Sequence, residues 1–202
     1  MTALADAQID RYSRQIIMPE VGGRGQERLL AARVALAGDA ELVGIVAALC
    51  ARAGVGALAV PGDVVVEPWP DCTVARHDGT APGDADVLVA LGDAPGWGVA
   101  AAARPRPLVS AQVVGPRIAV VTLAGRPCVA CAVAETTPPA PDDDTLAAPA
   151  ALVAAGLVAH EVVRLVVDPA ARGRRETLDL ATGLVASAPL DGPGCARCGP
   201  ST

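Results

Sequence analysis

Several residue types are missing from this chain or nearly so, and their absence narrows what the protein can do. The 202 residues contain no Phe, two Trp, one Tyr and two His. Lys is absent as well, so all 16 basic residues are Arg. Only arginine is therefore available to offset the charge of a phosphate. Two histidines scattered along the chain give no support to a Ser-His-Asp arrangement.

The charge and hydropathy patterns exclude two further classes of protein. The net charge of -6 argues against a nucleic-acid-binding surface, and the one basic cluster, Arg172, Arg174 and Arg175, is interpreted as a solvated loop. The polar, acidic N-terminus lacks the pattern of a secretory signal. The most apolar run, 146–159, is about 14 residues long, short of the roughly 20 that span a bilayer, and predicts a buried helix. We expect a cytoplasmic protein without nucleic-acid or membrane partners.

The stretch 33–60 predicts a strand, a tight turn, a helix and a second strand. Apolar runs at 34–37 and 57–60 flank an apolar helical stretch at 40–53, and Gly54 and Gly56 end that helix. Such a unit begins a nucleotide-binding α/β domain, in which the turn after the first strand faces the phosphates. A hydrophobic content of 52%, mostly Ala, Val and Leu, suits a parallel sheet covered by helices.

The turn after the first predicted strand is poorly suited to a phosphate. A dinucleotide fingerprint needs glycines where the backbone approaches phosphate, and only Gly38 meets that need. Asp39 is placed to cap the following helix and Glu41 lies in its first turn, so carboxylates satisfy the free N–H groups and the helix dipole. A triphosphate would meet repulsion of about 1 kcal/mol per charge pair in water and about 4 near a protein surface. Tight ATP binding is therefore not expected.

The remaining pattern predicts a Rossmann-like, doubly wound α/β fold with a mainly parallel sheet flanked by helices. A loose or helical lead over 1–10 precedes a polar segment at 11–15. The Pro- and Asp-rich segment 134–144 is a connector. Further expected elements are helices at 26–32, 98–103 and 146–167, a strand at either 64–67 or 73–76, strands at 86–91, 108–114 and 117–123, and a hairpin at 176–179 and 184–187.

Four of the six cysteines form the sharpest chemical motif. Cys128 and Cys131, like Cys195 and Cys198, are separated by two residues, which lets both sulfurs of a pair bind one metal. Two such pairs make a closed tetrahedral sulfur site that suits structural Zn²⁺ and would staple the C-terminal segment onto the domain. A redox pair or idle thiols are the alternatives. A redox pair usually caps a helix in a thioredoxin-like unit, which neither position shows.

The other candidate residues carry weaker signals. Asp93 follows a strand at the carboxyl edge of the predicted sheet, where ligands bind, although it could equally cap a loop. His160 and Glu161 lie within a helix and are interpreted as a half-buried polar spot. Cys50 is expected in the core. Cys72, in an irregular loop, is left as a reactive or an idle thiol.

Short motifs along most of the chain follow the order of a known family. In chain order they are RYSRQIIMPEVG from Arg11, Gly25-Gln26, Ala32-Arg33-Val34, Ala53-Gly54-Val55-Gly56, Asp86-Val-Leu-Val with Asp93, the passage into the first cysteine pair, the helix at 149–164 and the closing Gly-Cys-x-x-Cys-Gly. With these motifs the chain resembles the ThiF/MoeB/HesA proteins, the bacterial relatives of ubiquitin-activating enzymes.

The resemblance implies an activity and a set of site residues. The family uses ATP and Mg²⁺ to adenylate the C-terminal glycine of a small ubiquitin-like sulfur carrier. Its members are dimers, in which an N-terminal arginine, here Arg14, reaches the triphosphate in the partner's site. Arg11 and Gly38 would belong to the same nucleotide site, and the family's Mg²⁺/adenylate aspartate falls on Asp93.

The chain departs from the family pattern at the nucleotide site. The later glycines of the family's glycine-rich turn, its ribose-binding aspartate, its lysine and its cysteine in the connector are all missing, and about one helix–strand unit is lost between Gly62 and Asp93. The later glycines fall on Ala40, Glu41 and Val43 of this chain, and the ribose-binding aspartate falls on Gly62. These losses favour a homologue that kept the scaffold and lost the chemistry.

We therefore hypothesise a single ThiF-type domain over 1–202 that is a pseudoenzyme. It would comprise an N-terminal arm at 1–32, a core at 33–133, the connector at 134–144 and a C-terminal part at 145–202. It would form a homodimer or a heterodimer with an active family member, lending Arg14 in trans, or hold a ubiquitin-like carrier or peptide on its sheet. The alternatives are an active ATP-dependent adenylyltransferase and a sulfur-handling or redox protein using the cysteine pairs.

Overall fold

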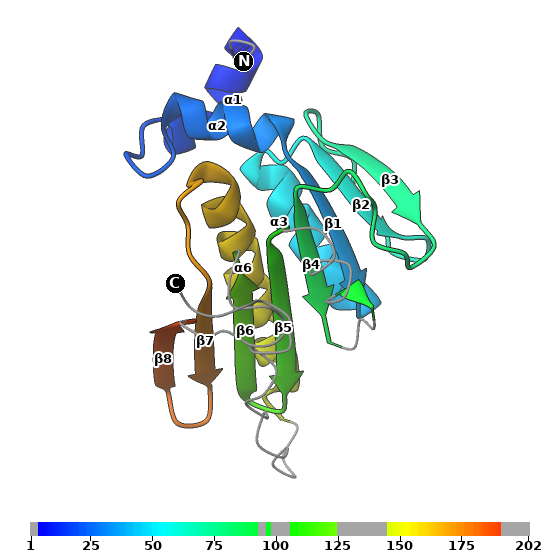
Figure 1. Ribbon diagram of the computed structural model, residues 1–202, viewed down its shortest axis with the longest axis vertical. Coiled ribbons are helices and arrows are strands. Elements are labelled where there is room, and N and C mark those ends of the chain that lie inside the picture. Colours follow the sequence, from blue (N-terminus) through cyan, green and yellow to red (C-terminus); the bar gives the residue numbers. More distant parts are fainter. Residues whose placement is uncertain (1–3, 93–95, 98–105, 125–144, 191–202) are drawn as a thin grey trace, which may run out of the picture.

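The protein folds around one eight-stranded sheet flanked by helices (Figure 1). This computed structural model describes residues 4–92, 96–97, 106–124 and 145–190. The elements are α1 (Asp6–Ile16), α2 (Gly22–Ala31), β1 (Arg33–Gly38), α3 (Ala40–Ala53), β2 (Ala57–Pro61), β3 (Thr73–His77), β4 (Val87–Leu91), β5 (Leu108–Val114), β6 (Arg117–Leu123), α6 (Ala147–Val167), β7 (Arg174–Asp179) and β8 (Leu184–Pro189).

The sheet confirms the predicted mixed α/β architecture. Its strand order is β3-β2-β1-β4-β5-β6-β7-β8. The pairs from β3 to β5 are parallel, and those from β5 to β8 are antiparallel. The chain turns back between β1 and β4, which makes the carboxyl ends of these two strands a topological switch point. The predicted zinc-stapled segment lies outside the described residues.

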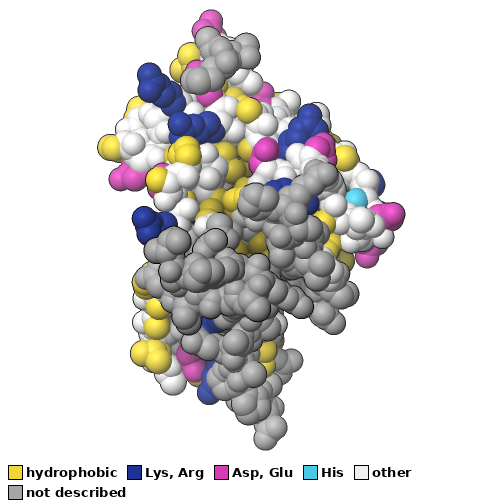
Figure 2. All heavy atoms as spheres, viewed as in Figure 1, with side chains coloured by type: hydrophobic (Ala, Val, Ile, Leu, Met, Phe, Trp, Pro, Cys, Tyr) yellow, Lys and Arg dark blue, Asp and Glu magenta, His cyan; other side chains and the backbone are white. Residues whose placement is uncertain are grey.

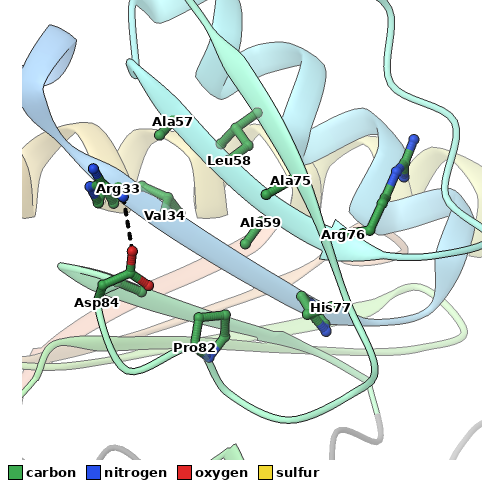
Figure 3. A pocket seen from close by; sticks show the side chains of 11 residues that line it. Arg33, Val34, Ala57, Leu58, Ala59, Ala75, Arg76, His77, Pro82 and Asp84 are labelled. Carbon is green, nitrogen blue, oxygen red and sulfur yellow. Dashed lines mark hydrogen bonds and ion pairs between the residues drawn. The ribbon is translucent and has the colours of Figure 1, made fainter.

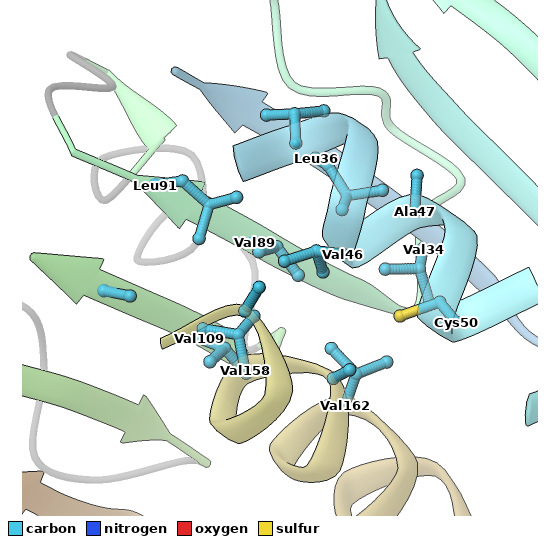
Figure 4. Close-up of a cluster of buried hydrophobic side chains, with 14 of the residues drawn as sticks. Val34, Leu36, Val46, Ala47, Cys50, Val89, Leu91, Val109, Val158 and Val162 are labelled. Atoms are coloured by element: carbon cyan, nitrogen blue, oxygen red, sulfur yellow. The ribbon is translucent and has the colours of Figure 1, made fainter. Parts of the chain in front are cut away.

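Side-chain alternation along the strands builds the core against α3 and α6 (Figure 4). Val34 and Leu36 of β1 face these helices, whereas Ala35 and Ala37 face the other side of the sheet. Strand β4 is buried on both faces, as expected for a central parallel strand. The largest core cluster therefore lies between the sheet and this pair of helices.

Helix α3 begins and ends where the sequence predicts. Its C-terminal residue is followed by Gly54 in a left-handed conformation with φ of 97°. A Cβ at Gly54 would lie 2.2 Å from Gln26 Nε2 and 3.2 Å from the ring of Tyr12. Glycine at this position thus ends α3 and also lets α1 and α2 pack closely.

Two connections in the parallel half of the sheet lack a helix. Residues 62–72, which we call the strap, join β2 to β3, and residues 78–86 join β3 to β4. The strap packs on α3 through Val64, which is 2% exposed, and through Val66 and Trp69. Strand β3 matches the second of the two alternative predictions, and residues 64–67 form no strand. Both connections lie within the stretch from Gly62 to Asp93, where the sequence predicts a shortening.

Helix α6 and the terminal hairpin form the antiparallel side of the molecule. By length and composition α6 could cross a membrane. One of its faces packs on β4, β5, β6, α2 and α3 and buries Ala150, Ala154, Val158 and Val162, as in a core helix. The opposite face is open, with Leu152 59% exposed. Strand β8 is exposed along its whole length.

The N-terminal segment is more helical than the sequence predicts. Helix α1 includes the expected polar segment at 11–15, and α2 begins at Gly22 rather than near Gln26. Glycine disfavours helix, but a Cβ at Gly25 would lie 3.0 Å from Val167 of α6. Close packing of α2 on α6 therefore overrides the local preference.

Candidate functional site

The switch point brings the ends of β1 and β4 into close contact at Gly38. This residue has a φ of 119°, and a Cβ there would lie 1.7 Å from Leu91 O. The backbone N–H of Asp39 donates to the same carbonyl at 3.1 Å. Glycine is thus required at position 38 by the contact between the two strands, whether or not a nucleotide binds.

Asp39 closes the N-terminus of α3, as the sequence predicts. Its carboxylate accepts a hydrogen bond from the backbone N–H of Leu42 at 3.0 Å. Glu41 follows in the first turn and is exposed. A cap of this kind contributes about 1 kcal/mol to stability. The helix terminus that would face a phosphate is therefore occupied by the protein's own carboxylate and carries a second one beside it.

Arg11 and Arg14 lie at the opposite end of the sheet from Gly38. Helix α1 sits at the amino ends of the strands (Figure 1). Gly38 ends β1, whose six residues span about 20 Å at ~3.3 Å per residue. The structure does not bring these three predicted site residues together within one chain.

The two arginines differ in their surroundings. The Arg11 guanidinium forms an ion pair with Asp71 of the strap. Arg14 is exposed and forms no hydrogen bond or ion pair with the part of the chain that the structure describes. Figure 2 shows arginine side chains gathered on the surface at this end of the molecule. Arg14 is thus the arginine of the RYSRQ motif that is available to another molecule.

The remaining predicted ligands fall outside the described residues. They are Asp93, Cys128, Cys131, Cys195 and Cys198. Within the described ranges, no group of three or more metal-ligating side chains occurs.

The two described cysteines lie in surroundings that disfavour the thiolate. Cys50 is buried in the core, as predicted, and burial raises its pKa to about 12. Burial also raises the pKa of Cys72 to about 11. Burial therefore favours the protonated form of both thiols, which is the less nucleophilic form.

A network centred on Asp71 was not foreseen from the sequence. Its carboxylate accepts hydrogen bonds from Arg11, from Gln8 Nε2 at 3.3 Å and from Tyr12 Oη at 3.2 Å. Trp69 Nε1 donates to Tyr12 Oη at 3.3 Å. Burial raises the pKa of Tyr12. No local pattern marks Asp71, because its partners lie about 60 residues away in the sequence.

A second unforeseen network surrounds Glu161. The side chain is fully buried and accepts hydrogen bonds from Thr122 Oγ1 at 2.5 Å, Arg164 Nη2 at 2.7 Å and Arg174 Nη2 at 2.5 Å. Burial alone would raise the pKa of Glu161, but the bonds from Arg164, Thr122 and Arg174 together lower it. The carboxylate therefore stays ionised and joins α6 to β6 and β7.

Two interpretations from the sequence are corrected by this network. Glu161 is not half-buried, and its neighbour His160 points outward with a side chain 62% exposed. Arg174 does not belong to a solvated loop but lies in β7. Long-range pairing decides both outcomes, because a fully buried carboxylate needs cationic partners.

A cavity of about 160 Å³ lies on the face of β1–β3 turned away from α3 and α6 (Figure 3). Its floor is Ala57, Ala59 and Ala75, and the Arg33–Asp84 ion pair of 2.8 Å borders it. His77 Nε2 lies 2.9 Å from Leu36 O, and His77 Nδ1 accepts from Gly79 N at 3.0 Å. Both ring nitrogens are thus engaged, so the cavity holds no free acid or base.

Comparisons with solved structures define the class of fold. E. coli MccB solved with AMPCPP and MccA has a TM-score of 0.72 and 17% identity, covering 94% of this chain and 74% of that chain. E. coli MccB with ATP has a TM-score of 0.68 and 16% identity, covering 98% and 75%. PaaA has a TM-score of 0.67 and 16% identity, covering 94% and 76%. The chain therefore has the α/β fold of MccB.

Curated sequence relatives match about a third of the chain. The SAMP-activating enzyme E1 of Haloferax volcanii is 52% identical over 68 residues, which are 33% of this chain and 25% of that protein. The adenylyltransferase and sulfurtransferase MOCS3 of Mus musculus is 48% identical over 65 residues, 32% of this chain and 14% of that protein. No protein-family model matches the chain.

These matches cover a quarter or less of the relatives' own length. Over that part, they confirm the resemblance to the ThiF/MoeB family of ubiquitin-activating-enzyme-like adenylyltransferases.

Proposed function

We propose that this chain is a ThiF-type homologue that acts by binding and does not itself adenylate. The observation that carries the proposal is the hydrogen bond from Leu42 N to the Asp39 carboxylate at the switch point. A phosphate at this terminus would displace that bond and lie against two carboxylates, Asp39 and Glu41. The repulsion is about 1 to 4 kcal/mol per charge pair at contact distance. The chain has no Lys to offset it.

In this proposal the active site belongs to a partner, and Arg14 is the residue lent to it. An exposed arginine without a polar partner among the described residues suits that role, because no internal contact has to be broken. The partner that supplies this site is an active family member, because a second copy of the chain would carry the same Asp39 cap and would also lack Lys. The open face of α6, with Leu152 and Val153 59% and 36% exposed, offers apolar surface for a dimer.

A carrier protein or peptide is the second proposed partner, held on the exposed face of the sheet. Two relatives motivate it: MccB is solved with MccA, and the Haloferax volcanii protein is named a SAMP-activating enzyme. The first was solved together with MccA and AMPCPP, and the second is named for activating SAMP. A pull-down from the source cell, followed by mass spectrometry, identifies which partner is present.

Arg14→Ala is expected to lower the ATP–pyrophosphate exchange of the co-purified complex about 100-fold, because a lent cation stabilises charge in the transition state. Arg24→Ala, which removes another exposed arginine at the same end of the molecule, serves as the control and should leave exchange unchanged. Full activity of the Arg14 variant, or recovery of no partner, would contradict the proposal.

An active adenylyltransferase remains the second candidate, because the sequence relatives carry that activity in their names. Isothermal calorimetry of the isolated chain with Mg·ATP separates the two. Our proposal expects no binding at micromolar concentrations. Micromolar binding together with pyrophosphate exchange by the isolated chain would establish the enzyme instead.

We also propose that Cys128, Cys131, Cys195 and Cys198 hold one structural Zn²⁺. Four thiolates in two closely spaced pairs are the donor set of a closed zinc site, which stabilises rather than catalyses. Elemental analysis of the purified chain should give about one zinc per molecule. The double variant Cys195→Ser/Cys198→Ser should lose the zinc and melt at a lower temperature, whereas Cys72→Ser should keep it. Four freely titratable thiols at these positions would favour a redox role.

A further inference from the structure

We propose that Asp71 is a positioning residue. Its carboxylate clamps α1 onto the strap and so fixes the direction in which the Arg14 side chain projects from the surface. The inference rests on the proposed function, in which Arg14 is the group lent to a partner. Neither the family resemblance nor the sequence pattern assigns a role to Asp71, which lies in the part of the chain that departs from the family.

One carboxylate holds a whole face of α1. Asp71 Oδ2 accepts from Arg11 Nη1 and from Tyr12 Oη at 3.2 Å, and Oδ1 accepts from Gln8 Nε2 at 3.3 Å. Gln8, Arg11 and Tyr12 are spaced three and four residues apart, so they share one side of the helix. Loss of the carboxylate would therefore remove one shared acceptor from three side chains at once.

The clamp is partly removed from water. The Arg11 side chain is 30% exposed, that of Asp71 is 15% exposed, and Tyr12 is 1% exposed. A charged hydrogen bond in such surroundings is stronger than an ion pair on the open surface. Asp71 is thus a firm anchor for α1.

The strap in turn is fixed to α3. The Arg52 guanidinium of α3 lies 6.0 Å from the Trp69 ring and 3.8 Å from Glu67 Oε2. Val64 is buried against the core. Because Trp69 also donates to Tyr12, the clamp connects α1 to the core rather than to a loose loop.

Arg14 lies one helical turn beyond Arg11, so any roll of α1 moves it directly. Among the helices, α1 packs chiefly on α2. The ion pair between Arg11 and Asp71 therefore sets the direction of the Arg14 side chain. Arg11 itself is engaged in this pair. Among the described residues, Arg11 of the motif is thus paired and Arg14 has no polar partner.

Hydrogen exchange tests the clamp without any partner. In Asp71→Asn, the amides of Asp6–Ile16 should exchange about tenfold faster, while those of α3 and α6 keep their wild-type rates. Asp63→Asn, an exposed aspartate of the same strap, is the matched control and should change nothing. Wild-type exchange in α1 of the Asp71 variant would overturn the clamp.

Pyrophosphate exchange by the complex with the co-purified partner tests the positioning of Arg14. Asp71→Asn should lower kcat about as far as Arg14→Ala with little change in KM for ATP, and the double variant should lose no more. Asp71→Glu should restore most of the activity. Independent, additive losses would overturn the positioning role. An Arg14→Ala complex with full activity would overturn the proposed function and the positioning of Arg14 with it, whereas the hydrogen-exchange result for the clamp would stand.

Discussion

Glu161→Ala is expected to lower the free energy of unfolding by about 3–5 kcal/mol, the usual cost of removing one member of a buried ion pair. The substitution leaves Arg164 and Arg174, whose side chains are 21% and 29% exposed, without their shared carboxylate. It also removes the acceptor of the Thr122 hydroxyl. The loss should appear as a lower urea midpoint followed by circular dichroism.

Two further variants serve as comparisons for the stability of Glu161→Ala. Glu67→Ala removes an 84% exposed carboxylate and should change stability by no more than about 0.5 kcal/mol. Glu161→Gln keeps the shape of the side chain and removes its charge, so it should fall between Glu161→Ala and the wild type. A midpoint for Glu161→Ala that matches the Glu67 control would show that the network contributes little.

The same network predicts a pH dependence. The pKa of Glu161 is lowered in the folded protein, so its contribution is fully present above the unfolded value of about 4.3 and is lost as pH falls through the folded value. Wild-type stability should therefore decline below about pH 4 more steeply than that of Glu161→Gln. Parallel stability curves for the two proteins would exclude Glu161 as the titrating group.

Gly38→Ala is expected to destabilise the fold by at least about 3 kcal/mol, because strain and a backbone clash act together. The added Cβ would lie 1.7 Å from Leu91 O at a φ of 119°. Neither partner can move without separating β1 from β4 at the centre of the sheet. Thermal unfolding in the absence of nucleotide measures the effect.

A second glycine provides the control for this substitution. Gly156 lies in α6, and a Cβ there would meet nothing within 4 Å. Gly156→Ala should therefore leave stability unchanged or raise it by about 0.5–1 kcal/mol. If Gly38→Ala unfolds at the wild-type temperature, then Gly38 is not needed for strand packing, and a role in approaching phosphate would be the better explanation.

Local patterns in the sequence were sufficient to predict most of the secondary structure. The apolar run at 40–53, bounded by Asp39 and Gly54, gave α3 with its cap and its end. The Gly-Pro pair at 115–116 separated β5 from β6 at the predicted residues. The information for these elements lies within a few neighbouring residues, which is why pattern alone finds them.

Features that depend on distant partners could not be predicted. The sequence predicts a half-buried Glu161 and gives no signal at Asp71, because their partners Arg174 and Arg11 are brought to them only by the fold. Helix α2 includes Gly25 despite its poor helix propensity because this position packs closely on Val167 of α6. The same holds for the candidate site. The Asp39 cap depends on neighbouring residues and was predicted, whereas the separation of Arg14 from Gly38 depends on the topology and was not.

The two connections without helices leave part of the sheet with little helical cover among the described residues. A parallel sheet is normally covered by helices on both faces, but across β2 and β3 the described helix, α3, and the strap lie on one side. On the other side, the segment 78–86 borders the cavity, whose floor is Ala57, Ala59 and Ala75. A methyl group leaves little apolar area in water, so these alanines lose little where no described helix covers them. Small side chains thus let this part of the sheet stand with a loop in place of a helix beside it.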